Sequence, residues 1–200
     1  MLQKQGFFLL FFYIELRLNI LRHSLTFVGL SWVMLFLVAC SSAPKHPSAV
    51  QLNPALVKKL NHMRMPSSLP IPVDRVQARE LKDTWGASRS SGRLHEGIDI
   101  LAPRGTKVRS ATPGLIADLR NNNLGGKVVW ILGPGGAWHY YAHLDGHKRG
   151  LKVGDYVKKG DVIGYVGNTG NARHTAPHLH YGLYLSGKGR GVVNPYPYLR

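Results

Sequence analysis

Three short stretches, far apart in the chain, place histidine beside groups that bind metals or transfer protons. His95 and Asp99 are four residues apart, His178 and His180 are two residues apart, and His143 lies between these pairs. In an extended strand, residues i, i+2 and i+4 share a face, so each pair can point in one direction. Zinc binds imidazole and carboxylate groups, and imidazole also transfers protons near neutral pH. Each pair is common by itself, but their occurrence together indicates a metal or acid–base site.

The chain's single cysteine, Cys40, restricts the kind of metal site that is possible. One cysteine cannot form an internal disulfide, and it excludes a four-cysteine zinc ribbon. The sequence contains ten histidines, however. A metal site in this chain must therefore use histidine and carboxylate ligands.

Short strands are the elements expected to position these residues. From residue 69 onward, short apolar stretches alternate with glycine turns, and the 200 residues include 23 Gly and 12 Pro. This pattern predicts a mainly β fold, a small antiparallel sheet of the barrel-sandwich type. The clearest hairpin joins 127–132 to 138–144. Short helices are predicted at 54–65 and 74–82.

Residues 1–39 are predicted to be an export signal. The apolar run 25–39 is shorter than the roughly 20 residues that cross a bilayer, and it ends in Leu-Val-Ala-Cys-Ser-Ser at residues 37–42. It resembles a bacterial lipoprotein signal. That resemblance implies cleavage before Cys40, lipidation of its thiol and a location in the cell envelope, at the outer membrane facing the periplasm. The alternative is a transmembrane anchor, and the earlier apolar run 6–14 has no assigned role.

The exported part is expected to consist of a lipid anchor and tether, residues 40–68, and one domain, residues 69–200. Without the first 39 residues, the chain has 23 Lys and Arg against 9 Asp and Glu, a formal charge of +14. This charge favours anionic polymers or a membrane surface as partners, or it serves only solubility. We expect no nucleic-acid binding, because the chain is exported and lacks helix-turn-helix and RNA-binding patterns. The oligomeric state does not follow from the sequence.

The three histidine stretches resemble the signature of the lysostaphin-type, or LytM-type, zinc endopeptidases, which cut peptides of bacterial peptidoglycan. That signature is His-x-x-x-Asp, then a histidine within Tyr-x-His-Leu, then His-x-His, and residues 69–200 contain all of it. The resemblance implies a Zn²⁺ ion bound by His95, Asp99 and His180. It also implies that His143 and His178 are the two catalytic histidines.

The same resemblance extends to the surroundings of the site. It implies long loops around a groove, with peptidoglycan peptide stems or cross-links as the partner. Arg89 stands where some relatives carry a residue that faces the scissile carbonyl, and it is a candidate helper. Two positions depart from the common pattern, because Gly182 replaces an acidic residue and Tyr181 replaces a phenylalanine. Two imidazoles and one carboxylate leave a fourth position for water, which is the pattern of catalytic zinc.

Three classes of function remain open at this point. The leading one is a zinc endopeptidase that hydrolyses peptidoglycan during cell-wall remodelling. The second is a non-catalytic activator of cell-wall amidases, or a peptidoglycan-binding module, that uses the same groove. The third is a small-molecule or metal carrier with a barrel-sandwich fold. The five intact signature positions favour the enzyme.

The remaining polar residues near the motifs carry weaker expectations. His139 is expected on the same strand face as Tyr141 and His143, as a supporting or solvated residue rather than a ligand. His174 is expected beside the groove. Glu96 is expected to turn away from the side that carries the metal ligands.

Overall fold

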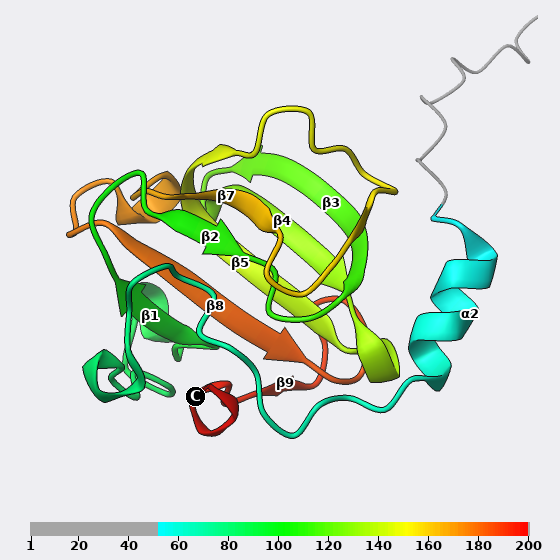
Figure 1. The fold of residues 1–200 in the computed structure, drawn as a ribbon. Helices are drawn as coiled ribbons and strands as arrows, with labels where there is room; N and C mark the ends of the chain where they lie inside the picture. The colour runs from blue at the N-terminus through cyan, green and yellow to red at the C-terminus, as the bar shows by residue number, and fades with distance from the viewer. Residues whose placement is uncertain (1–51, 200) are drawn as a thin grey trace, which may run out of the picture. The chain divides into compact units, whose positions relative to one another are not determined.

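The computed structural model describes residues 52–199 (Figure 1). The predicted export signal, Cys40 and the first part of the predicted tether lie outside the described residues. Within 52–199, no helix is long and apolar enough to cross a membrane.

Nine strands form one antiparallel sheet in the described part of the chain, which confirms the predicted mainly β fold. They are β1 (Ile98–Leu101), β2 (Lys107–Arg109), β3 (Gly114–Asn122), β4 (Gly126–Leu132), β5 (Trp138–His147), β6 (Tyr156–Val157), β7 (Val162–Val166), β8 (His178–Tyr184) and β9 (Val192–Val193). Their order is β1-β8-β5-β4-β3-β6, while β7 pairs with β2 and β5, and β9 pairs with β8.

The sheet curls so that β2 and β7 lie over β3, β4 and β5 (Figure 1). The main hydrophobic core fills the space between them, and we call the sheet surface that meets it the inner face. Ile131 of β4, Tyr141 of β5 and Leu179 of β8 are completely buried there. Because side chains alternate along a strand, the residues between these core positions project from the opposite, outer face.

The predicted hairpin between β4 and β5 is confirmed, with Trp130 opposite Tyr140 and Leu132 opposite Trp138. The predicted helix at 54–65 is confirmed in type and ends earlier, as α2 (Pro54–His62).

The predicted helix at 74–82 is wrong, because only a single 3-10 turn forms at Ala78–Glu80. Val73 instead bridges to the sheet, and the backbone N–H of the next residue bonds to a β2 carbonyl. The segment then begins with a turn in which Arg75 has φ 66°, so no helix starts at residue 74.

Within residues 52–68, which the sequence assigns to the tether, the apolar side of α2 packs against the sheet. Leu60 of α2 is only 1% exposed and packs on Leu115 and Leu132 of the outer face. The side chain of Asn53 caps the helix by accepting hydrogen bonds from two backbone N–H groups of the first turn. Burying a leucine side chain contributes about 2 kcal/mol, so α2 is held by packing as well as by its cap.

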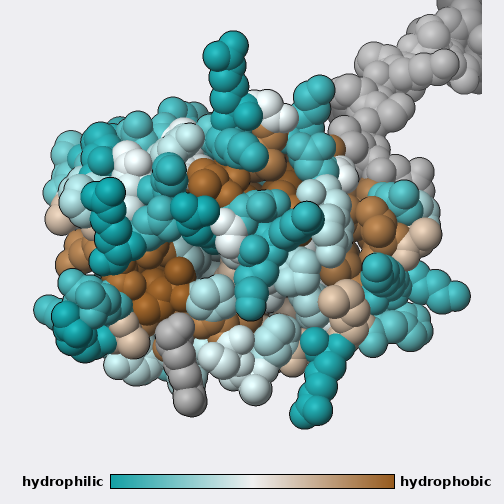
Figure 2. Space-filling model, viewed as in Figure 1, coloured by the Kyte–Doolittle hydropathy of each residue, from teal (hydrophilic) through white to brown (hydrophobic). Residues whose placement is uncertain are grey.

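Hydrophilic side chains cover most of the surface seen in Figure 2, with hydrophobic patches between them. Five large apolar side chains are exposed in the described residues, namely Leu94, Leu101, Leu124, Tyr156 and Leu185. Leu94 and Leu124 line the cleft described next.

Candidate metal centre and catalytic cleft

Strand pairing brings two of the predicted ligands together on the outer face. The register of β1 and β8 places Asp99 directly opposite His180. On the other side of β8, Ala142 of β5 is the residue opposite His180. Because the neighbours of Asp99 and His180 along each strand are core residues, both ligand side chains must point outward.

His95 joins them from a loop, since β1 begins only at Ile98. Its backbone N–H donates to Ala87 O at 2.9 Å, and its carbonyl accepts from Gly86 at 3.0 Å. These bonds, rather than strand alternation, turn the ring toward Asp99. Gly97 makes the close approach possible, because a Cβ at that position would lie 2.8 Å from His180 Nε2.

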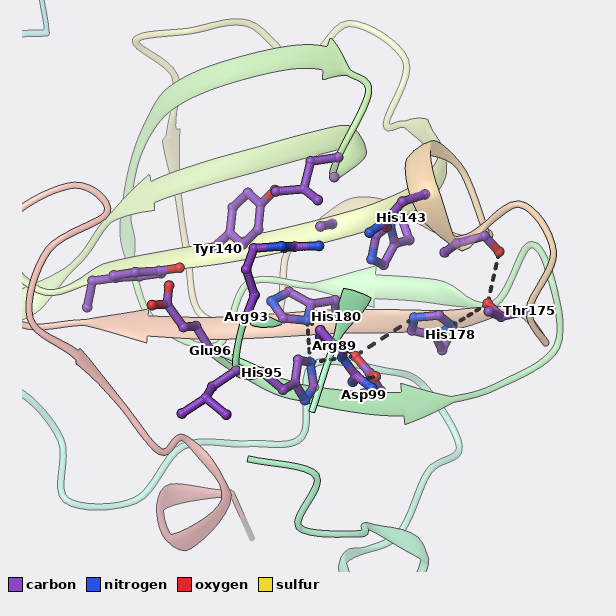
Figure 3. A pocket seen from close by; sticks show the side chains of 17 residues that line it. Arg89, Arg93, His95, Glu96, Asp99, Tyr140, His143, Thr175, His178 and His180 are labelled. Atoms are coloured by element: carbon purple, nitrogen blue, oxygen red, sulfur yellow. Dashed lines mark hydrogen bonds and ion pairs between the residues drawn. The ribbon is translucent and has the colours of Figure 1, made fainter. Parts of the chain in front are cut away.

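Three potential ligand atoms lie close together in this arrangement (Figure 3). His95 Nε2 is 2.8 Å from His180 Nδ1, and Asp99 Oδ1 is 3.0 Å from the first and 3.2 Å from the second. The ligands of tetrahedral zinc stand about 3.3 Å apart. These three residues are also the possible metal-binding group found among the described residues. The donor set and its spacing therefore fit zinc.

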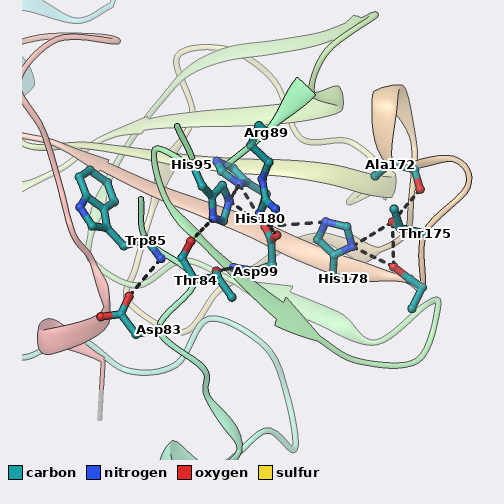
Figure 4. A network of polar contacts seen from close by, with 11 residues as sticks. Asp83, Thr84, Trp85, Arg89, His95, Asp99, Ala172, Thr175, His178 and His180 are labelled. Atoms are coloured by element: carbon teal, nitrogen blue, oxygen red, sulfur yellow. Dashed lines mark hydrogen bonds and ion pairs between the residues drawn. The ribbon is translucent and has the colours of Figure 1, made fainter. Parts of the chain in front are cut away.

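Thr84 and Arg89 orient these ligands from the loop that precedes β1 (Figure 4). The Thr84 carbonyl accepts from His95 Nδ1 at 2.7 Å, which leaves a lone pair on His95 Nε2. The Thr84 hydroxyl accepts from the backbone N–H of Asp99 at 3.0 Å. Arg89 pairs with Asp99 Oδ2 at 2.5 Å, which leaves Oδ1 facing the two histidines. The structure thus places Arg89 against the carboxylate of Asp99, a predicted ligand.

His143 and His178 lie beside this group and present their free nitrogens to it. His178 Nδ1 donates to the Ala176 carbonyl at 2.8 Å, and His143 Nδ1 donates to the Thr169 carbonyl at 2.9 Å. Since a carbonyl only accepts hydrogen bonds, each Nδ1 carries a proton, and in the neutral form of each ring the lone pair is on Nε2. The ring centres are 5.0 Å apart, and His178 Nε2 is 3.8 Å from Asp99 Oδ1.

A bulge in β5 brings His143 to the outer face. Lys127 pairs with Leu144, and Val129 pairs with Tyr141. Between these two pairs, β4 advances by two residues and β5 by three. The extra residue breaks the alternation, and His143 adopts a left-handed backbone with φ 61°. The expectation that His139, Tyr141 and His143 share one face is therefore wrong. His143 lines the cleft, whereas the other two are buried in the interior.

Burial and neighbouring charges set the protonation of these groups. Burial, with smaller effects from nearby His180 and His178, lowers the pKa of His143 from 6.5 to about 4. Burial also lowers the pKa of His180. For Asp99, burial raises the pKa, but contacts with His180 and His95 outweigh it and hold the pKa well below its usual range. At neutral pH the site therefore contains the Asp99 carboxylate and the neutral rings of His143 and His180.

The site opens into a cleft of about 550 Å³. Sequence reasoning missed several residues of its wall, because only the fold brings them to it: Arg93, Leu94, Leu124, Tyr140 and Tyr184. Glu96 is exposed, and it lines the same cleft. His174 is not among the lining residues, where its neighbour Thr175 stands instead.

His139 is fully buried on the inner face and takes no part in the cleft. Its Nδ1 lies 2.7 Å from the Tyr181 hydroxyl, and its Nε2 lies 3.2 Å from Thr112 Oγ1. Both ring nitrogens are therefore occupied. Burial lowers the pKa of His139 to about 4, so the ring is neutral.

Comparison with known proteins identifies the family. A model of Peptidase family M23 matches residues 93–195. This range includes the three predicted zinc ligands and the two predicted catalytic histidines, namely His95, Asp99, His180, His143 and His178. This chain belongs to that family. The L-Ala–D-Glu endopeptidase of Bacillus subtilis is 39% identical over 140 residues, which are 66% of this chain and 42% of that protein.

Lysostaphin supplies both a sequence and a structural match to this M23 chain. The Staphylococcus simulans protein is 35% identical over 113 residues, which are 55% of this chain and 22% of lysostaphin. The solved catalytic domain of lysostaphin aligns with a TM-score of 0.53 and 31% identity, covering 60% of this chain and 92% of that domain. The chain thus spans less than half the length of these curated relatives but matches nearly all of the lysostaphin domain.

Proposed function

We propose that this M23 chain is a zinc-dependent endopeptidase that hydrolyses peptide bonds of bacterial peptidoglycan in cell-wall remodelling. The observation that carries the proposal is the cluster of three ligand atoms, 2.8–3.2 Å apart, beside two imidazoles with free Nε2 atoms. Relatives named as endopeptidases of L-Ala–D-Glu bonds and of glycyl-glycine bonds support peptidoglycan peptides as the substrate. A non-catalytic amidase activator would have no use for this complete set.

His95, Asp99 and His180 would hold the zinc ion, which when bound would polarise the scissile carbonyl and activate a water. His143 and His178 would move the protons. Because each Nδ1–H is already bonded to a backbone carbonyl, each ring first accepts a proton at Nε2 and only then has a proton to donate. One ring therefore takes the proton of the attacking water. Once protonated, it stabilises the developing oxyanion or protonates the leaving amine.

The proposed location is the cell envelope, with the protein held by lipid on Cys40 at the outer membrane and facing the periplasm. The short apolar run and the Ala39-Cys40 junction support this location. Acyl chains would hold the chain at the membrane, and the +14 charge would add attraction to anionic surfaces.

Digestion of purified sacculi by the full-length protein tests the activity. Mass spectrometry of the released muropeptides reports both cleavage and the identity of the bond, and metal analysis of the same sample reports zinc. We expect one zinc per chain and new peptide ends. Intact muropeptides after incubation with zinc-loaded protein would contradict the proposed activity.

Replacing Cys40 by serine tests the location separately. The variant should remain unprocessed and carry no lipid, because it lacks the thiol that is modified. Metabolic labelling with a fatty acid and fractionation of cells measure both effects. A Cys40→Ser protein that is processed and fractionates like the parent would contradict the lipoprotein interpretation.

A further inference from the structure

Arg93 is a cation of the cleft that the chemistry proposed above does not use. It lines the cleft and is exposed, and its guanidinium extends into the cleft in Figure 3. Its Nη2 reaches Ser90 Oγ only at 3.4 Å. Among residues 52–199, no carboxylate lies within ion-pair distance of Arg93, whereas Arg89 from the same turn is bound to Asp99.

The backbone that carries Arg93 is fixed from both sides. Its carbonyl accepts a hydrogen bond from the N–H of Arg89 at 2.8 Å, and the turn between them contains Ser91 with φ 64°. The next residue, Leu94, forms a bridge with Ser88. Arg93 therefore stands in an ordered turn, two residues before His95, and it lines the same cleft as the three proposed ligands.

The acidic group of the same wall does not neutralise it. Burial, with a smaller effect from the charge of Glu96, raises the pKa of Tyr184 to about 12, so the Glu96 carboxylate acts on that tyrosine. Arg93 and Glu96 both line the cleft, and within residues 52–199 they form no ion pair with each other. A guanidinium binds a carboxylate through two parallel hydrogen bonds, and it cannot do so with a neutral amide.

We propose that Arg93 selects peptides that carry a free carboxylate next to the scissile bond. A glutamate joined through its γ-carboxyl group has such a carboxylate, whereas an uncharged glycine bridge has none. The inference rests on the proposed endopeptidase function and names the substrate class of that same cleft. It makes Arg93 a specificity residue, distinct from the metal ligands and the two proton-transferring histidines.

Two synthetic stem peptides that differ only in this group, free carboxylate against carboxamide, test the inference on the full-length zinc-loaded protein. The wild type should cleave the carboxylate peptide with a kcat/KM roughly tenfold higher. In Arg93→Gln, the preference should vanish through a higher KM for the carboxylate peptide, with kcat nearly unchanged. Arg93→Lys keeps the positive charge but lacks the planar guanidinium that binds both carboxylate oxygens. It should retain part of the preference.

Arg149→Gln is the matched control, because it removes the same charge from an exposed position outside the cleft. It should keep the full preference, and all variants should keep one zinc. A wild type that treats both peptides alike, or an Arg93→Gln protein that keeps the preference, would overturn the inference.

Calorimetric binding of both peptides separates this inference from the proposed function. Preferential binding of the carboxylate peptide without any cleavage would contradict the endopeptidase activity and support the role of Arg93. Cleavage of both peptides with equal affinities would support the activity and contradict the role of Arg93.

Discussion

The two faces of strands β5 and β8 use histidine in opposite ways. On the inner face, His139 is completely buried, and both of its ring nitrogens contact hydroxyl groups. On the outer face, His143 and His178 each have only Nδ1 bonded to a carbonyl, so that Nε2 faces the cleft. The residue type and the strands are the same. The buried histidine has partners at both ring nitrogens, whereas the two proposed catalytic histidines have a hydrogen-bond partner only at Nδ1.

The comparison also shows how little backbone separates the two environments. His180 and Tyr181 are consecutive in β8, yet His180 belongs to the metal-binding group and Tyr181 contacts His139 in the core. If the two faces are independent, changes on the outer face should alter metal content and rate. Changes on the inner face should alter only stability.

His180→Ala should have the largest effect, because it removes one of only three proposed ligands. We expect loss of bound zinc and a fall in the cleavage rate of at least about a thousandfold, since no water is activated without the metal. Metal analysis and sacculus digestion measure these effects. A variant that still holds one zinc per chain would show that His180 is not a ligand.

His143→Ala and His178→Ala should have a smaller effect of a different kind. The three proposed ligands remain, so zinc should be retained while the rate falls by about a hundredfold or more through lost proton transfer. Metal content measured beside digestion separates these variants from His180→Ala. If zinc is lost from His178→Ala but kept in His180→Ala, the assigned roles of these two residues are reversed. If all three variants digest sacculi at the wild-type rate, the proposed endopeptidase activity is wrong.

His139 should make folding stability depend on pH. The unfolded chain protonates this ring near pH 6.5, and the folded chain does so only at about pH 4, because burial lowers the pKa. Between these values the unfolded state binds more protons, so stability falls as the pH is lowered from about 6.5 to about 4. The loss reaches about 3 kcal/mol. Denaturant unfolding of wild type and His139→Phe at several pH values should show a flatter dependence in the variant, and equal slopes would contradict the explanation.

Tyr181→Phe should have the smallest effect, although it is adjacent to a ligand. It removes the hydroxyl bonded to His139 and should cost about 1–2 kcal/mol of stability. Zinc content and cleavage rate should not change, because the side chain lies on the inner face. A fall in zinc affinity would show that the two faces are coupled through β8.

Much of the fold was predictable from local pattern. The glycine-punctuated apolar stretches indicated short antiparallel strands, and the hairpin of β4 and β5 formed where the turn residues placed it. The predicted ligands also meet, since Asp99 and His180 lie opposite each other in neighbouring strands. Residues on regular strands can be placed from their periodicity, because alternation fixes the face of the sheet to which each one points.

The features that sequence reasoning missed depend on details of pairing and packing that strand periodicity does not contain. The bulge at His143 exists because β4 and β5 pair with unequal numbers of residues. His95 is oriented by the loop at Thr84 and Ala87, not by strand alternation. The packing of α2 depends on apolar residues of β3 and β4, more than 50 positions later in the chain. Periodicity and turn residues predict the strands and the hairpin, but they do not predict the bulge, the loop contacts of His95 or the packing of α2.

At the His143 bulge, a change that stabilises the fold would also remove a proposed catalytic group. A left-handed backbone at a residue other than glycine costs about 1–2 kcal/mol, so His143→Gly, or deletion of one residue to restore regular pairing, should relieve that strain. Both changes would remove the imidazole from the cleft. Selection for thermal stability alone would therefore favour variants that lack this imidazole. Any engineering of this chain for stability must screen for activity at the same time.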